Sequence, residues 1–294
     1  MHRWAAWHLH LPTLDPRAQD QVVVDVVGPA VNWLRARDEA AEWFFVRYWQ
    51  HGPHIRFRVA GLGSDLVRQM DQLLRAVMIV PQPEERLTVA AYRSHVAPLA
   101  AAGEGGGTIA VGVLWPAGVY RQPYVPEPDR YGGKDLLRVS ESLFVSSSEL
   151  VLAFASRRPP PGARAGLALQ ATAAAVQVLP EEDQRLGFCQ RSGDGWRAWA
   201  GLDDDRRPVV AVTDELAGRI RAPSTTGPVR RWVDGLAPAF RAWRDAGPDG
   251  LAEKILHSHI HMLHNRLGLS IAHELAHYQT IAHVLTPRKV PVGS

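Results

Sequence analysis

The chain has 294 residues, of which 46% are hydrophobic and 21% are charged, and its formal net charge is +3. A chain of this length can bury a substantial core, and this composition excludes disorder over most of it. The single cysteine, Cys189, excludes a disulfide framework and a cysteine-based zinc site, and it fits a reducing cytoplasm.

The N-terminal residues do not resemble a signal peptide, and no run approaches the ~18 apolar residues of a membrane-spanning helix. We therefore expect a cytoplasmic protein with no membrane partner. Arginine is far commoner than lysine, which favours an anionic partner because guanidinium groups bind carboxylates and phosphates in a planar, bidentate way. A GC-rich genome explains the same bias equally well. The near-neutral charge balance and the lack of a recognisable motif argue against nucleic-acid binding.

The first 133 residues are predicted to be rich in strands, because several short runs are aromatic, β-branched or alternately apolar and polar. Two such runs around Gln50 and Gly52 indicate a β-hairpin, and Ser64 indicates the start of a helix. In chain order the predicted elements are a strand at 4–11, a helix at 20–35 interrupted near Gly28 and Pro29, hairpin strands at 43–49 and 54–60, a helix at 65–78, strands at 87–92 and 108–115, and an irregular loop at 116–133.

From Lys134 onward, apolar residues recur at helical spacing. The predicted helices are 135–156, 163–179, 181–190, 229–245, 250–267 and 271–284. Because strands lead and helices follow, the pattern favours an α+β fold over an alternating α/β fold. We expect a mostly antiparallel sheet from the N-terminal half, covered by helices mainly from the C-terminal half. We also expect a single domain, residues 1–294, with a strand-rich part at 1–133, a helix-rich part at 134–286 and a short tail at 287–294.

The predicted hairpin is unusually basic. Side chains alternate between the two faces of a strand, so His54, Arg56 and Arg58 share one face. A four-residue turn would place Arg47 directly opposite Arg56, where two like charges repel each other and weaken the sheet. An anion between the two guanidinium groups would relieve that repulsion, which indicates an anion site. The alternative is a solvated outer face with structural salt bridges to nearby glutamates: Glu84, Glu85 or Glu127.

Three segments taken together resemble one family, the C-terminal domains of lantibiotic dehydratases. The first is RY at 47–48 with HIRFR at 54–58, and the second is YVPEPDRYGG at 124–133, followed by Glu141, Phe144 and Ser148. The third is HMLHNRLG at 261–268, on a helix near the C-terminus. Their order and spacing agree with the family over residues 4 to 285. The resemblance implies the α+β fold of the domain that eliminates glutamate in these dehydratases.

The resemblance also implies a function in modifying ribosomally made peptides. Full-length dehydratases eliminate glutamate from glutamylated serine or threonine, whereas relatives in thiopeptide pathways include pyridine synthases. These join two dehydroalanines in a formal [4+2] aza-cycloaddition, then expel water and the leader peptide. The chain lacks a glutamylation domain, so we expect a stand-alone member. Elimination domains carry Asp-Ser where this chain has Ser147 and Ser148. That departure favours a pyridine synthase, with a stand-alone glutamate-elimination lyase as the alternative.

The resemblance assigns the chemistry to histidine and arginine. Histidine transfers protons near neutral pH, so His261 is the candidate for amide tautomerisation and later dehydration. Ser258 and Asn265 lie one helical turn to either side and would hold the amide. Arg47 and Arg56 would stabilise developing charge or, in a lyase, grip the glutamyl carboxylate. The competing interpretation of His261 is a core histidine bonded to a carbonyl.

A second group of residues is assigned to substrate binding. Glu127, Arg130 and Tyr131 either line the substrate cleft or pin their loop through an ion pair. The remaining candidates lie on the hairpin and on the helix near the C-terminus: His54, Arg58, Asn265 and Arg266. A protein of another class, a non-catalytic scaffold that binds the leader peptide, would keep the fold without this chemistry.

A second motif suggests a rival function. His273-Glu274-Leu275-Ala276-His277 satisfies HExxH, the zinc-binding helix of metalloproteases. The glycine that would turn the chain in the related HExxHxxGxxH motif is replaced by Thr280, so we expect a continuous helix. A rise of ~1.5 Å per residue then carries His283 too far along the helix to share a metal with His277. This excludes a metzincin, and it leaves as alternatives a zincin in which His273 and His277 share the metal with a distant ligand and a zinc site at the histidines 257, 261 and 264. Because no acidic or cysteine ligand accompanies those three histidines, we expect neither a metal nor a cofactor.

The expected partner is a precursor peptide that carries its leader and has a dehydrated, azole-containing core. A hydrophobic stripe in the helix predicted at 229–245 contains Trp232, Phe240 and Trp243. It indicates either a homodimer interface or part of the core.

Overall fold

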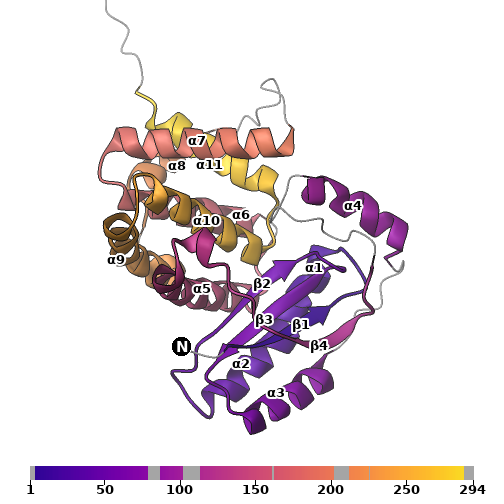
Figure 1. Cartoon of the computed structure of the whole chain (residues 1–294). Helices are drawn as coiled ribbons and strands as arrows, with labels where there is room; N and C mark the ends of the chain where they lie inside the picture. Colours follow the sequence, from indigo (N-terminus) through magenta and orange to yellow (C-terminus); the bar gives the residue numbers. More distant parts are fainter. Residues whose placement is uncertain are drawn as a thin grey trace, which may run out of the picture. The chain divides into compact units, whose positions relative to one another are not determined.

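The computed structural model describes residues 4–78, 87–101, 113–160, 162–201, 212–224 and 226–287 (Figure 1). Contacts divide the chain into two compact units. The first comprises the residues up to Pro159 together with Asn265–Gly268, and the second comprises Pro160–His264 and the residues from Leu269 onward. The change from one unit to the other thus falls at residue 159, well after the change of sequence pattern near Lys134. The single domain that the sequence predicts stays a prediction.

The first unit contains a four-stranded antiparallel sheet in the order β2-β3-β1-β4 (Figure 1). The strands are β1 (Trp4–His10), β2 (Trp43–Tyr48), β3 (His54–Ala60) and β4 (Gly118–Gln122). The N-terminal strand and the hairpin are therefore confirmed. Strand β4 lies inside the segment predicted to be an irregular loop. That prediction was wrong because the many prolines and glycines flank a short run, Val119 to Arg121, that pairs with β1.

The hairpin register differs from the predicted one by a residue. Tyr48 lies opposite His54, and Arg47 lies opposite Ile55 instead of Arg56. The turn contains five residues, 49 to 53, because His51 and Gly52 both adopt positive φ angles of 62° and 111°. A shift by one residue reverses the face of every side chain on the strand. Arg47 and Arg56 therefore point to opposite faces, and the predicted repulsion between them does not exist.

The helices of the first unit begin with α1 (Pro16–Val22), a π-helical segment (Val23–Val27) and α2 (Gly28–Arg35). These follow one another without a break, although the sequence predicted an interruption near Gly28. Pro29, which has no N–H group, lies in the first turn of α2, directly after the wider π turn. Helix α3 (Ser64–Val77) agrees with its prediction.

Helix α4 (Val89–Ala101) replaces the strand that was predicted at 87–92. That prediction was wrong because two alanines in this run favour a helix, and Thr88 begins it by accepting a hydrogen bond from the N–H of Ala91 at 3.1 Å. The strand predicted at 108–115 lies mostly outside the described residues, and its last three residues form no strand.

One face of the sheet forms the core of the first unit. Strands β1 and β3 bury Trp7, Leu9, Ile55 and Phe57 completely on this face. Helices α1 and α3 contact β3 and β4, and α5 (Lys134–Ala155) contacts β2. The α+β class and the antiparallel sheet are confirmed. The covering helices come largely from the N-terminal half, whereas the sequence predicted them mainly from the C-terminal half.

The second unit is helical in its described residues. Its elements are α6 (Ala163–Ala175), a 3-10 turn (Val176–Val178), α7 (Glu182–Ala200), α8 (Asp214–Arg221), a second 3-10 turn (Gly227–Val229), α9 (Arg230–Ala246), α10 (Leu251–Leu267) and α11 (Ile271–Leu285). The last three residues of α10 belong to the first unit. Helix α7 is longer than predicted, and α8 was not predicted. On α9, Trp232 and Trp243 are completely buried and Phe240 is 7% exposed, so the stripe belongs to the core. No helix in the described part of the chain is long and apolar enough to cross a membrane.

The outer edge of β2 is closed by side chains. The N–H of Arg47 donates to Oδ1 of Asn265 at 3.0 Å, and Nδ2 of Asn265 donates to the carbonyl of Arg47 at 2.9 Å. The hydroxyl of Ser148 on α5 accepts from the N–H of Phe45 at 3.1 Å and from Nε of Arg266 at 3.0 Å. These bonds satisfy backbone groups that an edge strand would otherwise leave open.

We predict that Ser148→Ala destabilises the protein by about 1–3 kcal/mol, because it leaves two buried donors without this acceptor. Urea denaturation measures the change in the free energy of unfolding. The control is Ser142→Ala, an exposed position on the same helix, which should change stability by less than about 0.5 kcal/mol. Equal effects of the two substitutions would contradict the prediction.

Candidate functional site

The polar face of the sheet gathers most of the basic residues predicted from the hairpin. The register places His8 opposite Arg56 and His10 opposite His54, so that residues from β1 and β3 lie on one face. Arg58 follows on the same face, two residues after Arg56. The structure thus brings together three of the predicted site residues, His54, Arg56 and Arg58, and adds two histidines from β1.

The two arginines on this face are held by aromatic rings. The guanidinium carbon of Arg56 lies 3.3 Å from the centre of the Tyr48 ring, and that of Arg58 lies 5.0 Å from Phe44 and 4.8 Å from Tyr124. Burial lowers the pKa of Arg58 to about 10, and the charge of Arg56 acts in the same direction. Arg58 therefore keeps its charge at neutral pH. The two arginines form a fixed cationic surface that can bind carbonyl or carboxylate oxygens.

The three histidines on this face stack on one another. His54 lies between the other two, with ring centres 4.7 Å from His8 and 4.3 Å from His10. Burial is the main cause that lowers the pKa of His8 to about 3 and that of His10 to about 4, and nearby positive charges add to it. Burial likewise holds the pKa of His54 well below its usual range. All three imidazoles are therefore neutral at neutral pH.

Three other predicted residues lie at the outer edge of β2. Nε of Arg47 donates to the carbonyl of Arg266 at 2.9 Å, and its terminal nitrogen forms an ion pair with Asp20 at 2.6 Å. Arg47 and Arg266 are both buried, and burial lowers the pKa of Arg266 to about 9. Asn265 bonds to the backbone of β2, as described above. These three side chains fix the position of β2, and through the hairpin they fix β3.

The loop before α5 carries Glu127, Arg130 and Tyr131. Arg130 and Glu127 form an ion pair at 3.5 Å across a 3-10 turn (Pro128–Tyr131), and Tyr131 is buried with its ring edge against Phe144. A pocket of about 610 Å³ lies between β4 and the start of α5, and none of these three residues lines it. The ion pair is the one expected if these residues pin the loop.

The second unit contains a histidine–carboxylate pair. Nδ1 of His261 on α10 lies 2.9 Å from Oε2 of Glu274 on α11. The carboxylate is 1% exposed, whereas the His261 side chain is 14% exposed. When Nδ1 carries the proton and donates it to the carboxylate, Nε2 keeps its lone pair. Nε2 has no hydrogen-bond partner among the described residues. The pair is arranged as in a general base that a carboxylate orients.

The charge of Glu274 is stabilised by its neighbours. Burial alone raises the pKa of this carboxyl, but the charge and hydrogen bond of His261, together with His264 and His257, outweigh it and hold the pKa at about 2. Burial lowers the pKa of His264 to about 4. Trp196 packs against His261 with ring centres 4.9 Å apart, which shelters one side of the imidazole. Ser258 is 9% exposed and lies one turn before His261 on α10.

The HExxH segment forms part of a continuous helix. Helix α11 runs through Thr280 to Leu285, as predicted. Nδ1 of His273 lies 2.8 Å from the hydroxyl of Ser270, and His277 packs against His264. Glu274, the residue that would be the catalytic base of a metalloprotease, is bound to His261. The sequence pattern identified Glu274 for the wrong chemistry, because it could not show which neighbour the carboxylate meets.

The candidate residues are therefore divided between the units. His261, Ser258 and Glu274 lie in the second unit, and the hairpin residues with Asn265 and Arg266 lie in the first. Sequence reasoning missed two residues, His8 and His10, and it missed the contact between Glu274 and His261. The alternation His8-Leu9-His10 on a predicted strand was a signal for the first two, because it places both imidazoles on one face.

Comparison with known proteins gives a match over nearly the whole chain. The model of the lantibiotic biosynthesis dehydratase C-terminal family matches residues 4–285. No curated protein sequence matches the chain.

Solved structures share the fold at low identity. The pyridine synthase TbtD from thiomuracin biosynthesis has a TM-score of 0.70 and 18% identity, over 96% of this chain and 97% of that one. The structure of TsrL has a TM-score of 0.64 and 16% identity, over 97% of this chain and 94% of that one. The tRNA-dependent lantibiotic dehydratase MibB from Microbispora sp. 107891 has a TM-score of 0.59 and 19% identity, and the match covers 96% of this chain but 28% of that one.

We predict that Glu274 stabilises the fold in a pH-dependent way. Its pKa falls from 4.5 in the unfolded chain to about 2 in the folded one, so its contribution is fully present above pH 4.5 and is lost as pH falls toward 2. The contribution amounts to at most about 3 kcal/mol. Chemical denaturation should show that Glu274→Gln is less stable than the wild type at pH 7 and that the difference narrows below pH 4.5. The control is Glu253→Gln on α10, which should change the free energy of unfolding little at either pH. A constant difference from pH 7 to pH 3 would contradict this linkage.

Proposed function

Because this chain belongs to the lantibiotic biosynthesis dehydratase C-terminal family, we propose that it is an enzyme that modifies a ribosomally made peptide still carrying its leader. More specifically, we propose a pyridine synthase reaction. Two dehydroalanines of the core peptide are joined in a formal [4+2] aza-cycloaddition, and water and the leader peptide are then lost. The likeness to TbtD, over 97% of that pyridine synthase, supports this choice. We place the reaction in the cytoplasm, in keeping with the unpaired, buried Cys189.

The observation that carries the proposal is the pair of His261 and Glu274. The reaction needs a proton removed from an amide nitrogen and returned to the amide oxygen, which gives the imidic acid form that reacts as the azadiene. An imidazole whose Nδ1 is bound 2.9 Å from a buried carboxylate can do both with Nε2. Glu274 stabilises the imidazolium that forms and keeps the ring in one tautomer, without taking the proton itself.

The same imidazole serves the later steps. After the two carbon skeletons have joined, the former amide oxygen is present as a hydroxyl group. His261 protonates it as it leaves as water, and the ring loses a proton to form the new double bond. The leader then leaves as a carboxamide, which needs a proton on its nitrogen and the loss of one from the ring. Each step balances one proton given against one removed.

The hairpin residues are proposed to hold the peptide. Arg56 and Arg58 bind backbone carbonyls or stabilise developing negative charge, and His54 lies beside them. Asn265, which bonds to the backbone of β2, acts with Arg47 and Arg266 by positioning that strand: the Arg47 side chain bonds to the carbonyl of Arg266, and the Arg266 side chain bonds to Ser148. In the second unit Ser258 holds the reacting amide. Glu127, Arg130 and Tyr131 remain proposed substrate contacts at the loop: they follow from the family resemblance.

Ser147 supports a cyclase over an elimination lyase. Its hydroxyl is buried and donates to carbonyls of its own helix, Leu143 at 2.7 Å and Phe144 at 3.1 Å. A hydroxyl bound in this way supplies neither the negative charge nor the base of the aspartate found there in elimination domains. The lyase is a second candidate because Arg56 and Arg58 form a cationic surface suited to a glutamyl carboxylate.

We predict that the purified protein converts a leader-bearing peptide with two dehydroalanines into a free leader and a macrocycle. Mass spectrometry should detect the leader as a carboxamide, together with a macrocycle whose mass equals that of the starting peptide minus the leader carboxamide and one water. The same protein should leave a glutamylated precursor unchanged. An unchanged dehydroalanine peptide, combined with loss of glutamate from the glutamylated one, would identify the lyase instead.

We predict that His261→Ala lowers kcat by about 10²- to 10⁴-fold, the usual contribution of a general acid–base. Glu274→Gln should lower kcat by about 10²-fold with little change in KM, because it keeps the shape of the side chain and removes its charge. The control is His273→Ala, an exposed position next to Glu274, which should keep full activity. Circular dichroism shows whether each variant is folded. Full product formation by folded His261→Ala would show that His261 does not supply this chemistry, whereas a folded wild type that binds the leader peptide and forms no product would indicate a binding scaffold.

A further inference from the structure

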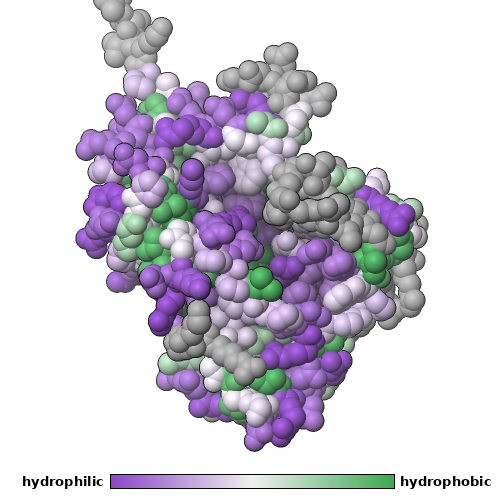
Figure 2. Space-filling view, in the orientation of Figure 1, coloured by the Kyte–Doolittle hydropathy of each residue, from purple (hydrophilic) through white to green (hydrophobic). Residues whose placement is uncertain are grey.

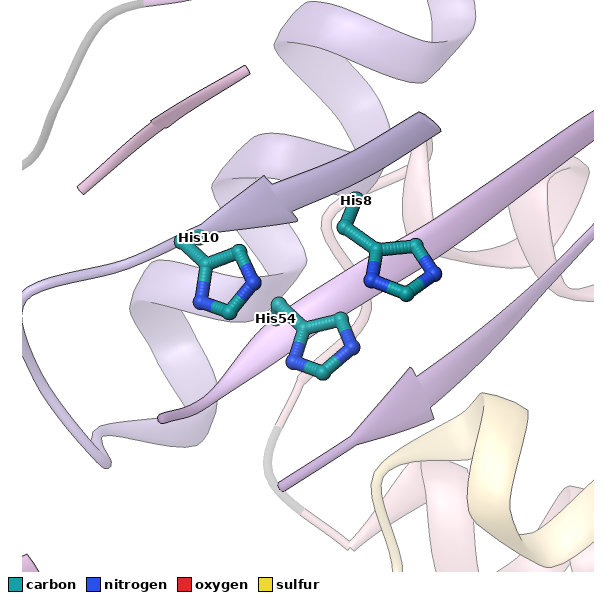
Figure 3. A group of neighbouring side chains, drawn as sticks. All are labelled: His8, His10 and His54. Carbon is teal, nitrogen blue, oxygen red and sulfur yellow. The ribbon is translucent and has the colours of Figure 1, made fainter. Parts of the chain in front are cut away.

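We propose that His8, His10 and His54 form a binding site for one divalent transition-metal ion, of which Zn²⁺ is the natural type. Among the residues that the structure describes, they are the one group of three or more histidine, cysteine, aspartate or glutamate side chains whose ligand atoms all lie within 4.8 Å of one another (Figure 3). The site differs from the HExxH segment and from the pair of His261 and Glu274, and its existence does not depend on the proposed reaction.

The sheet positions the three side chains by register. His8 and His10 are separated by one residue on β1, so both project from the same face, and His54 lies directly opposite His10 on β3. Figure 3 shows the three rings side by side above the two strands, with His54 between the other two. Neighbouring antiparallel strands are rigid supports, which suits a site that must hold three ligands in fixed positions.

His54 has the arrangement of a metal ligand with an oriented ring. Its Nδ1 lies 2.8 Å from the carbonyl oxygen of Gly52, and a carbonyl can only accept, so Nδ1 carries the proton. The lone pair is therefore on Nε2. Histidines that bind metals almost always donate their other ring N–H in this way, often to a backbone carbonyl.

His10 provides an independent observation. It is completely buried, and neither of its ring nitrogens has a hydrogen-bond partner among the described residues. The rings of His54, Trp115 and Tyr120 surround it with centres 4.3 to 5.3 Å away. A neutral imidazole always has one nitrogen that can accept, and burying that nitrogen without a partner is unfavourable. A metal ion bound to it would satisfy the lone pair.

The chemistry of the group selects the ion. Three neutral imidazoles with an open fourth position are the ligands of one class of zinc site, and imidazole also suits Cu²⁺ and Ni²⁺ better than Mg²⁺ or Ca²⁺. Nε of Arg56 lies 3.2 Å from Nε2 of His54, so a bound metal replaces this hydrogen bond. The guanidinium then favours an anionic fourth ligand, such as hydroxide or a carboxylate, which also offsets its repulsion of the cation.

Binding requires the rings to turn. The His54 ring is tilted by 17° from His10 and by 25° from His8, so it stacks on both, and the planes of His8 and His10 differ by 40°. A metal lies in the plane of each imidazole that binds it, and rings stacked in this way cannot all point at one ion. Rotation about the Cα–Cβ and Cβ–Cγ bonds brings the nitrogens together without moving the strands. His8 is only half-buried, so fewer neighbours restrict its rotation than that of His10 or His54.

The test measures metal binding by the full-length protein, free of any affinity tag and stripped with a chelator. Calorimetric titration with Zn²⁺ should give one ion per chain, and Co²⁺ should give the visible absorption of a low-coordinate nitrogen site. His8→Ala should weaken Zn²⁺ binding by at least about 100-fold, because it removes a direct ligand and even indirect partners contribute about 10- to 100-fold. His54→Ala should do the same, and thermal unfolding shows whether each variant is folded.

The control is His273→Ala, which removes the first histidine of HExxH and should leave Zn²⁺ binding unchanged. The proposal is overturned if the wild type binds no stoichiometric Zn²⁺, if His8→Ala and His54→Ala bind as tightly as the wild type, or if His273→Ala abolishes binding. Since the readout is binding and not turnover, the result is independent of the pyridine synthase assay. Either proposal can therefore fail while the other stands.

Discussion

The outer edge of β2 is the constraint on which the first unit depends. An edge strand exposes N–H and C=O groups that need partners, and here side chains supply them. Ser148 and Asn265 bind the backbone of β2, and Arg266 binds Ser148 in turn. These residues belong to segments that resemble the family, at 144–148 and 261–268. These hydrogen bonds give the three residues a structural role, which is separate from any contact that they make with substrate.

Glu274 with its histidines in the second unit and the histidines on the sheet differ in the charge that they keep when buried. In the second unit a buried carboxylate keeps its charge, because His261 binds it and other histidines stand close. On the sheet the histidines are neutral mainly because burial lowers their pKa values, and the nearby charge of Arg56 acts in the same direction. One arrangement stores a fixed negative charge beside a base. The other offers neutral nitrogen lone pairs beside fixed positive charges, so the two suit different ligands.

The local patterns predicted the elements better than their relations. Alternation identified β1, and helical spacing identified α5, α9, α10 and α11 within about two residues of their observed ends. The hairpin register was missed because it depends on the positive φ angles of His51 and Gly52, which no hydrophobic pattern encodes. Strand β4 was missed because its five residues carry too little periodicity to outweigh their proline and glycine neighbours, and helix α4 was missed because the six residues at 87–92 were interpreted as a strand. Tertiary contacts decide such segments.

The histidine motifs show that local patterns also fail to predict which residues meet in a functional site. HExxH is a regular spacing on one helix, and the spacing is present, yet Glu274 is bound to His261, thirteen positions earlier on another helix. His8, His10 and His54 have no shared local motif, since forty-three residues separate the last two, and the sheet alone makes them neighbours. A spacing rule describes residues on one helix or strand, whereas both sites described above combine side chains from two elements. The chemistry of a histidine in this chain is thus set by the side chain across from it, and only a register or a helix contact can supply that information.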